Sequence, residues 1–308
     1  PPAGVSAIRG HDSRRSRGIL GKNLFADPSA GICLIAVVGT NGKTTVTYLI
    51  ESILRAAGHR VGVLGTVNYR YGDRTLPAPN TTPESFELQR IIREMADHGV
   101  THVVMEVSSH AVSLRRVDDC AFDLGIFTNL TQDHLDFHGT MERYFQAKKR
   151  FFAEVLTAGG KNHRRPMIIN ADDPWGRRIL RQSEIGRLTY GIEVPSDVTA
   201  SPFHLTLQGI EAVLHLVGER LSITSPLMGR FNLSNILAAA AAAFELGIPG
   251  GLIRDGIAAL THVPGRLEKV STAGQPAVFV DYAHTDDARR RVLENLAAFR
   301  TGRIITVF

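Results

Sequence analysis

Residues 37–45 are the most informative stretch of this chain: Val37-Val38-Gly39-Thr40-Asn41-Gly42-Lys43-Thr44-Thr45. They join an apolar run over 32–38, which predicts a buried strand, to a segment over 44–57 with apolar residues at helical spacing. The two glycines let backbone N–H groups turn inward, and with the helix N-terminus these form a cradle for phosphates. Lys43 adds a charge for the outer phosphates, and the Thr44 hydroxyl suits Mg²⁺. Because Val37 stands where the usual G-x-x-x-x-G-K-[ST] pattern has glycine, an ordinary strand-to-helix turn is the alternative.

Length and composition are those of an ordinary globular protein with room for two domains: 308 residues, 44% hydrophobic and 21% charged. The chain has no apolar run of about 18 residues, and residues 1–17 lack the apolar centre of a signal peptide. We therefore expect a cytoplasmic protein that makes no membrane contact and keeps Cys33 and Cys120 reduced. The net charge of +5 comes from scattered basic residues, and the runs at 148–150 and 289–291 fit solvated helix faces. This suits polyphosphate and an anionic substrate, and we expect no nucleic acid partner.

From residue 31 to about 190, strand-like and helix-like segments alternate, which predicts an α/β fold with a parallel sheet covered on both faces. Strands are expected at 32–38, 61–67, 102–107, 122–127, 167–170 and 188–190, and helices at 44–57, 83–98, 141–156 and 174–181. Residues 203–226 change to short alternating runs typical of a small antiparallel sheet, followed by helices at 233–246 and 252–260. After a boundary at 263–265 we expect a strand at 277–280, a helix at 286–299 and a strand at 303–308. That last strand has no helix to cover it, which suggests a domain that has been cut.

Ligands of such sheets bind at the carboxyl ends of the strands, where further polar residues are expected. Glu106 ends an apolar strand, so it could hold Mg²⁺ opposite Thr44 or simply pair with a lysine. Residues 129–138 place two histidines and two aspartates in one loop. The cluster could bind a metal, or its members could be ordinary loop and helix-cap residues. Asn80-Thr81-Thr82-Pro83 offers an amide and two hydroxyls, either to a ligand or as a helix cap. Arg266, and Asp281-Tyr282-Ala283-His284 after an apolar strand, could each touch a nucleotide.

Lys148 is the least ordinary candidate, because its helical neighbours three and four positions away are all aromatic: Tyr144, Phe145, Phe151 and Phe152. Burial lowers the pKa of a lysine, and a neutral amine can react with carbon dioxide to form a carbamate, which is an oxygen ligand for Mg²⁺. The residues alone favour the alternative, in which the stem lies on the rings and the ammonium reaches water.

Together these motifs resemble the Mur ligase family, and within it the MurE-type branch, from about Arg14 to Phe308. The stretch at 39–44 is common to Mur ligases and cyanophycin synthetase. Three stretches are more particular to the branch: Asn80 to Glu84, Glu106 to Ala111, and Asp133 to Glu142. The motifs at 229–235, 264–268 and 281–285 follow in the family's order.

The resemblance implies an ATP-dependent ligase of peptidoglycan synthesis. ATP would phosphorylate UDP-N-acetylmuramoyl-L-alanyl-D-glutamate, and the amine of meso-diaminopimelate or L-lysine would displace phosphate to leave an amide. Two Mg²⁺ ions are implied, the first on Thr44 and Glu106, the second on Glu106, His134 and carbamylated Lys148. Lys43 would stabilise the transferred phosphoryl group. Other matching positions are Asn232, Asn235, Arg266, Asp281 and His284 for the nucleotide, and Thr81, Thr82, Ser108 and Arg116, with the adjoining Asn80, for the UDP-muramoyl substrate.

The resemblance also implies domain limits and departures from the family. Residues 1–26 would be the tail of a uridine-nucleotide domain, 27–262 the central ATP-binding domain, and 263–308 the start of a Rossmann-like domain. A chain truncated in this way should bind nucleotide but ligate poorly, as a monomer, and the residues that select the diamino acid are absent. Asp286 stands where most members have proline, and Leu114 where some have glutamine. The alternatives are another ATP-dependent ligase, such as folylpolyglutamate synthetase, or a nucleotide-binding fragment without turnover.

Overall fold

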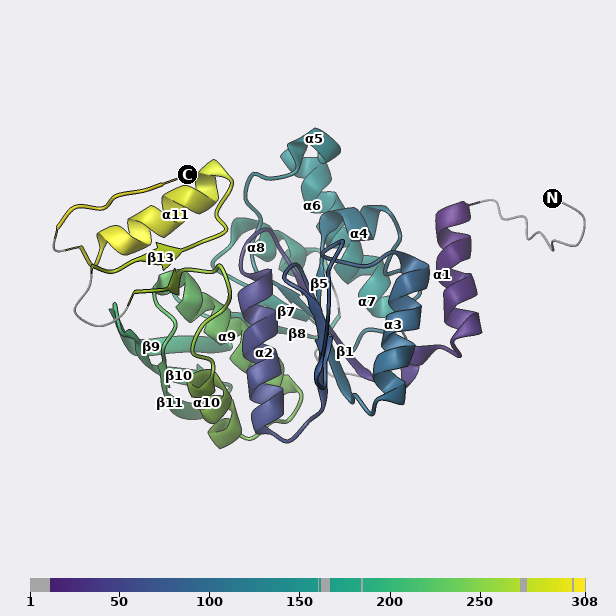
Figure 1. Cartoon of the computed structure of the whole chain (residues 1–308), viewed down its shortest axis with the longest axis horizontal. Coiled ribbons are helices and arrows are strands. Elements are labelled where there is room, and N and C mark those ends of the chain that lie inside the picture. The colour runs from purple at the N-terminus through teal and green to yellow at the C-terminus, as the bar shows by residue number, and fades with distance from the viewer. Residues whose placement is uncertain are drawn as a thin grey trace, which may run out of the picture.

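The computed structural model describes residues 12–159, 161, 167–183, 185–271, 276–300 and 302–307, and shows one large sheet with helices on both faces (Figure 1). The strands are β1 Cys33–Val38, β2 Val61–Leu64, β3 Tyr69–Tyr71, β4 Arg74–Leu76, β5 His102–Val107, β6 Leu124–Phe127, β7 Met167–Asn170, β8 Arg187–Tyr190, β9 Val198–Thr206, β10 Gly209–Leu216, β11 Glu219–Ser225, β12 Glu268–Lys269 and β13 Phe279–Val280. The α-helices are α1 Ser13–Leu24, α2 Lys43–Ala56, α3 Ser85–Asp97, α4 Ser109–Ser113, α5 Leu135–His138, α6 Met141–Arg150, α7 Leu156–Ala158, α8 Pro174–Arg181, α9 Arg230–Glu245, α10 Gly250–Ala259 and α11 Asp286–Ala297. A short 3-10 helix, η1, spans Pro28–Gly31, and a π-helical turn, η2, spans Phe151–Val155.

The strand order in the large sheet is β11-β10-β9-β8-β7-β6-β1-β5-β2-β3-β4. Every neighbouring pair from β9 to β2 is parallel, and the pairs outside that range are antiparallel. This confirms the predicted α/β class with a mostly parallel sheet. The predicted antiparallel strands are present as β9 to β11, and β9 joins them to the main sheet by pairing with β8 at Tyr190 and Val198.

Strand β1 shows why both faces of the sheet must be covered. Ile35 and Val37 pack on one face with α2, α9 and α10, whereas Leu34, Ala36 and Val38 pack on the other with α3 and α6. All of these side chains are fully buried. A parallel strand buried on both faces is a continuous apolar run, which is the pattern that predicted it.

Two local expectations differ from the structure, and two elements were not expected. The helix expected over 141–156 begins at Met141 but continues after Arg150 as η2 and then α7. The strand expected at 303–308 is wrong for its described part: residues 303–307 form no ladder, and Ile305 and Val307 are 81% and 93% exposed. A strand requires a neighbour for its backbone groups, and no described strand pairs with this segment. Helix α1 and the β3–β4 hairpin were not predicted.

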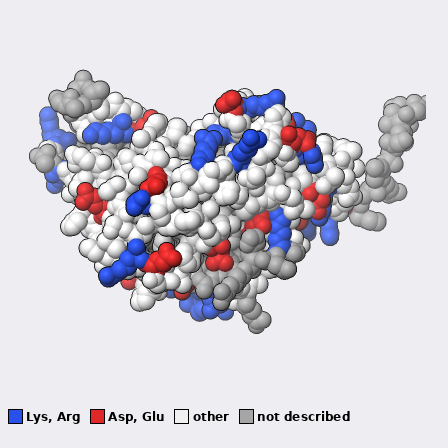
Figure 2. All heavy atoms as spheres, turned by 90° about the horizontal axis from the view of Figure 1, so that it is seen from below, with Lys and Arg blue, Asp and Glu red and all other residues white. Residues whose placement is uncertain are grey.

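Three further features concern the cysteines, the hydropathy of the helices and the surface charge. Cys33 and Cys120 are free, as predicted. Across the described residues, no helix has both the length and the apolar character needed to cross a bilayer. On the face seen from below, Lys and Arg side chains are interspersed with Asp and Glu (Figure 2).

Candidate functional site

The glycine loop of residues 39–42 joins β1 to α2 at the carboxyl edge of the sheet, as predicted. Gly42 is the N-cap of α2 and lies in the left-handed region with φ of 87°. A Cβ at position 42 would approach Asn235 Oδ1 of α9 to 2.4 Å, so both the backbone and its neighbour require glycine. No described side chain caps the first turn of α2. Its N–H groups therefore remain for an anion.

The loop is anchored to residues 128–131, which follow β6. The Thr40 N–H donates to the Asn129 carbonyl at 2.9 Å, and the Asn41 N–H donates to Asn129 Oδ1, also at 2.9 Å. The hydroxyl of Tyr144 on α6 lies 3.1 Å from Thr40 Oγ1. The anchoring roles of Asn129 and Tyr144 were missed in the sequence. A polar residue directly after a buried strand was the available signal for Asn129, and Tyr144 had none beyond its place in an aromatic stripe.

Two lysines converge on the carbonyl oxygen of Gly39. Lys43 Nζ donates to it at 3.1 Å and Lys148 Nζ at 2.7 Å, while Lys43 also donates to the Thr40 carbonyl at 2.8 Å. Burial lowers the pKa of Lys43, with Glu106 opposing that change. Burial holds the pKa of Lys148 well below its usual value, and the charge of Lys43 lowers it further.

Lys148 does not reach solvent, so the alternative in which its ammonium lies in water is wrong. Its exposed fraction is 1%, and its Nζ lies 4.7 Å from the centre of the Tyr144 ring. The aromatic residues around it are themselves buried, which places the whole side chain inside the stripe. Lys149, the next residue, is half-buried. The run at 148–150 is therefore only in part a solvated face.

Thr44 and Glu106 are brought together as predicted. The Thr44 hydroxyl donates to Glu106 Oε1 at 3.0 Å and accepts from Arg266 Nη2 at 3.1 Å. Thr66, which the sequence argument missed, donates its N–H to Glu106 Oε1 at 2.9 Å and its hydroxyl to Oε2 at 3.0 Å. Thr66 lies two residues beyond the end of β2, so the strand-end argument could have made it a candidate, although not its contact with Glu106.

The oxygen donors of this pair fit Mg²⁺. Mg²⁺ takes one or two protein oxygens and completes its shell with waters and phosphates, so a hydroxyl beside a carboxylate at a phosphate cradle is a suitable donor set. Within the described part of the chain, no group of three or more His, Cys, Asp and Glu side chains is placed to enclose a metal. The amine of Lys148 adds an oxygen ligand only as a carbamate.

The histidines of the 129–138 loop lie in different environments. His134 Nε2 pairs with Asp133 Oδ2 at 3.3 Å, and its ring centre lies 4.8 Å from that of His110. Burial lowers the pKa of His134, against the effect of Asp133. His138 Nε2 instead lies 2.9 Å from Ser109 Oγ, and burial lowers its pKa to about 4. No hydrogen bond among the described residues joins His134 to Glu106 or to Lys148.

The segment expected to hold the substrate packs around Thr82. Its hydroxyl donates to the Glu106 carbonyl at 2.9 Å and accepts from the Ser108 N–H at 3.1 Å. Arg116 Nη1 donates to the Thr82 carbonyl at 3.0 Å. The helix-cap alternative is wrong, because α3 begins at Ser85 and none of the described side chains caps it. Asn80 is exposed, and its carbonyl accepts from the hydroxyl of Tyr69.

The residues expected on the nucleotide side are only partly gathered. Asn232 and Asn235 are buried on α9, where Asn235 Nδ2 donates to Asn232 Oδ1 at 3.1 Å. Asn235 lies beside Gly42 of the glycine loop, and Arg266 donates to the Thr44 hydroxyl in the first turn of α2. Asp281 instead accepts the Leu267 N–H at 2.7 Å and the Ala283 N–H at 2.8 Å, so backbone groups use both of its oxygens. His284 is exposed, and no hydrogen bond in the described residues links it or Asp281 to the loop.

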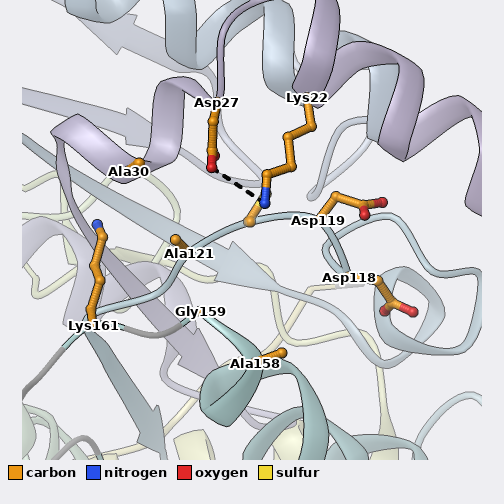
Figure 3. Close-up of a pocket in the computed structure, with 10 residues that line it drawn as sticks. Lys22, Asp27, Ala30, Asp118, Asp119, Ala121, Ala158, Gly159 and Lys161 are labelled. Atoms are coloured by element: carbon orange, nitrogen blue, oxygen red, sulfur yellow. Dashed lines mark ion pairs between the residues drawn. The ribbon is translucent and has the colours of Figure 1, made fainter.

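A cavity of about 300 Å³ lies elsewhere, near the amino ends of β1 and β6 (Figure 3). It is lined in part by Lys22, Asp27, Asp119 and Lys161, with Lys22 and Asp27 paired at 3.3 Å. None of the predicted site residues lines it.

Two protein-family models match this chain. The Mur ligase middle domain matches residues 37–243, and the Mur ligase, glutamate ligase domain matches residues 265–308. A UDP-N-acetylmuramoyl-L-alanyl-D-glutamate--2,6-diaminopimelate ligase of Geobacter metallireducens is 47% identical over 307 residues, covering 100% of this chain and 60% of that protein. The protein of the same name from Geobacillus thermodenitrificans is 42% identical over 296 residues, covering 96% of this chain and 60% of that protein. The chain thus spans about 60% of the length of these relatives.

Solved structures agree in fold. A structure titled UDP-N-acetylmuramoyl-L-alanyl-D-glutamate--2,6-diaminopimelate ligase superposes with a TM-score of 0.80 at 29% identity, over 97% of this chain and 61% of that one. Folylpolyglutamate synthetase of Lactobacillus casei, with a TM-score of 0.69 at 18% identity over 97% and 79%, shares the fold alone. The glycine loop, the sheet and the middle-domain match lead to one conclusion: the chain belongs to the Mur ligase family.

Proposed function

We propose that this chain is the nucleotide-binding part of an ATP-dependent ligase that adds a diamino acid to UDP-N-acetylmuramoyl-L-alanyl-D-glutamate in peptidoglycan synthesis. The observation that carries the proposal is the contact of Thr44 with Glu106 beside the uncapped start of α2 and Lys43. The names of the relatives support this substrate and favour 2,6-diaminopimelate as the diamino acid. Residues 27–262 are proposed as the central domain and 263 onward as the next domain.

The residues suit an acyl phosphate route. The substrate carboxylate attacks the terminal phosphorus of ATP and releases ADP. The amine of the diamino acid then attacks the acyl carbon, and inorganic phosphate leaves as the amide forms. When bound, Mg²⁺ neutralises phosphate charge. Lys43 turns from the loop carbonyls to the transferred phosphoryl group, which carries most of the developing charge.

The remaining residues position the reactants. Thr44, Glu106, His134 and carbamylated Lys148 are proposed to hold Mg²⁺, and Asn232, Asn235, Arg266, Asp281 and His284 to contact ATP. Thr81, Thr82, Ser108 and Arg116, with Asn80, are proposed to orient the UDP-muramoyl substrate. We propose a cytoplasmic location for the reaction, which both nucleotide substrates support.

A phosphate-release assay on the full-length protein tests the proposal. We expect release only when ATP, UDP-N-acetylmuramoyl-L-alanyl-D-glutamate and 2,6-diaminopimelate are all present. Release with a different UDP-muramoyl precursor would identify another Mur reaction. Nucleotide binding without release in any combination would favour a nucleotide-binding module without turnover.

A further inference from the structure

Thr66 donates hydrogen bonds to both oxygens of the Glu106 carboxylate, and it belongs to none of the motifs described above. We propose that Thr66 is a positioning residue that orients Glu106 toward Mg²⁺ and connects this carboxylate to Thr81 in the substrate segment. The inference rests on the proposed function, because it takes Glu106 as a Mg²⁺ ligand.

The contacts of Glu106 explain why one residue can set its orientation. Its exposed fraction is 1%, so described protein groups rather than bulk water must satisfy its charge. Thr66 supplies an N–H to Oε1 at 2.9 Å and a hydroxyl to Oε2 at 3.0 Å, and Thr44 supplies a second donor to Oε1 at 3.0 Å. Donors on both oxygens prevent rotation of the carboxylate plane. Oε1 accepts two of these donors and Oε2 accepts one, so Oε2 keeps a lone pair available for a metal.

The sheet register puts Thr66 in this place. Strand β2 runs parallel to β5 with Leu64 opposite Met105, so residues 65 and 66 pass alongside Glu106. A Cβ on Gly65 would approach Glu106 Oε1 to 2.6 Å. The absence of a side chain at 65 thus allows the backbone to pass close to the carboxylate and to present the Thr66 N–H to it.

The hydroxyl groups of Thr81 and Thr66 form a chain of hydrogen bonds in which each donor points toward Glu106. Thr66 Oγ1 and Thr81 Oγ1 are 3.1 Å apart. A threonine hydroxyl has one hydrogen, and Thr66 gives its own to the carboxylate, which can only accept. Thr81 must therefore donate to Thr66. A substrate that takes the Thr81 hydrogen removes this bond, so the substrate segment and the metal ligand belong to one chain of hydrogen bonds.

Thr66→Val tests the inference, because valine keeps the shape and the backbone N–H but removes the hydroxyl. We expect Mg²⁺ affinity, measured by calorimetry in the presence of a non-hydrolysable ATP analogue, to fall about 10- to 100-fold, as for other residues that orient a metal ligand. Thr66→Ser, which keeps the hydroxyl but lacks the methyl group, should keep the wild-type Mg²⁺ affinity. Loss of packing alone would not give this result. The matched control is Thr47→Val: its buried hydroxyl donates to the Thr44 carbonyl at 2.7 Å and makes no contact with Glu106. Mg²⁺ affinity should be unchanged there.

The outcomes separate the inference from the proposed function. A wild-type chain that binds no Mg²⁺ with nucleotide overturns both. A wild type that binds Mg²⁺, together with a folded Thr66→Val that binds it equally well, overturns only the role of Thr66. If the valine variant does not fold, Thr66→Ala replaces it in the same titration.

A double-mutant cycle tests the connection to Thr81. Thr81→Val should weaken Mg²⁺ binding in the wild-type background and have little further effect on Thr66→Val. Independent losses that multiply in the double variant would overturn the connection.

Discussion

Lys43 donates to two carbonyl oxygens of its own loop, so it lies at the phosphate cradle before any phosphate arrives. We expect Lys43→Ala to weaken binding of a non-hydrolysable ATP analogue with Mg²⁺ about 10- to 100-fold, the effect of losing one hydrogen bond from a charged donor. Calorimetry on this chain measures it. Lys149→Ala, on a more exposed part of α6, is the control and should bind normally. Equal affinity of the Lys43 variant, with equal turnover at full length, would exclude the loop from the mechanism.

Lys148 allows a chemical rescue. A carbamate is an oxygen ligand, so Lys148→Ala at full length should be inactive and should regain part of its activity with acetate or formate, because a small carboxylate can occupy the vacated space. Lys148→Arg should stay inactive with the same additives, since a guanidinium keeps its charge and forms no carbamate. Phosphate release at increasing carboxylate concentration is the measurement. Full activity with an unmodified Lys148, seen in a density map with Mg²⁺ bound, would contradict the assignment.

The same lysine makes stability depend on pH. Burial lowers its pKa in the folded chain, whereas in the unfolded chain the pKa is about 10.4. Between those two values the unfolded state binds more protons, so the free energy of unfolding rises with pH up to about 10.4. In buffer free of carbon dioxide, Lys148→Met should therefore be more stable than wild type at pH 7. The difference in the free energy of unfolding between the two proteins, measured by urea titration, should narrow toward pH 10. A difference that widens would contradict the argument.

At the scale of elements, the contact between α2 and α10 depends on one glycine. A Cβ at position 256 would approach the Ile53 Cα of α2 to 2.3 Å. Gly256→Ala should destabilise the fold by about 1–3 kcal/mol through overpacking. Thermal unfolding measures it, with Gly251→Ala as the control. Gly251 lies on the same helix, and an added Cβ there meets no atom within 4 Å, so that variant should be neutral or slightly stabilising. Equal melting temperatures for the two variants would show that the helices can separate freely.

Elements with their own apolar period were predictable, and those without one were not. The strands of the parallel sheet are apolar runs, so their pattern predicts them. The residues that α1 buries are Gly18 and Gly21, which leave no apolar stripe to detect. The π-helical turn at 151–155 lies against Gly125 of β6, and no residue type in the pattern distinguishes it from an α-helix.

At the scale of the whole molecule, the thiols report on global opening. Burial raises the pKa of Cys33 to about 12, with Asp123 contributing, and burial also raises the pKa of Cys120. Because the thiolate is the reactive form, iodoacetamide at pH 8 should label neither cysteine in the native chain and both in denaturing urea. Mass spectrometry over time gives the extent of labelling. Rapid native labelling of either residue would contradict the raised pKa of its thiol.

The candidate site shows a similar division between what the sequence predicts and what it leaves open. Thr44 and Glu106 meet because Glu106 lies near the carboxyl end of β5 and the loop before Thr44 leaves the neighbouring parallel strand β1, which the sequence indicates. The depth of Lys148 depends on how η2 and the aromatic stripe pack, and the residues alone favoured a solvated ammonium. The orienting contact from Thr66 depends on the order β5-β2, which no local pattern reveals. The roles of the remaining predicted site residues stay predictions.

The two lysines on the Gly39 carbonyl have a consequence for how easily the loop changes state. A carbonyl oxygen has two lone pairs, and here each has a donor. When Lys43 leaves for a phosphate, Lys148 still satisfies the oxygen, and a carbamate at Lys148 keeps one N–H for the same bond. The Gly39 oxygen therefore keeps a donor throughout this exchange, whereas a buried acceptor left without one would cost about 1–3 kcal/mol. At Gly39, nucleotide entry and release can proceed without a rearrangement of the backbone.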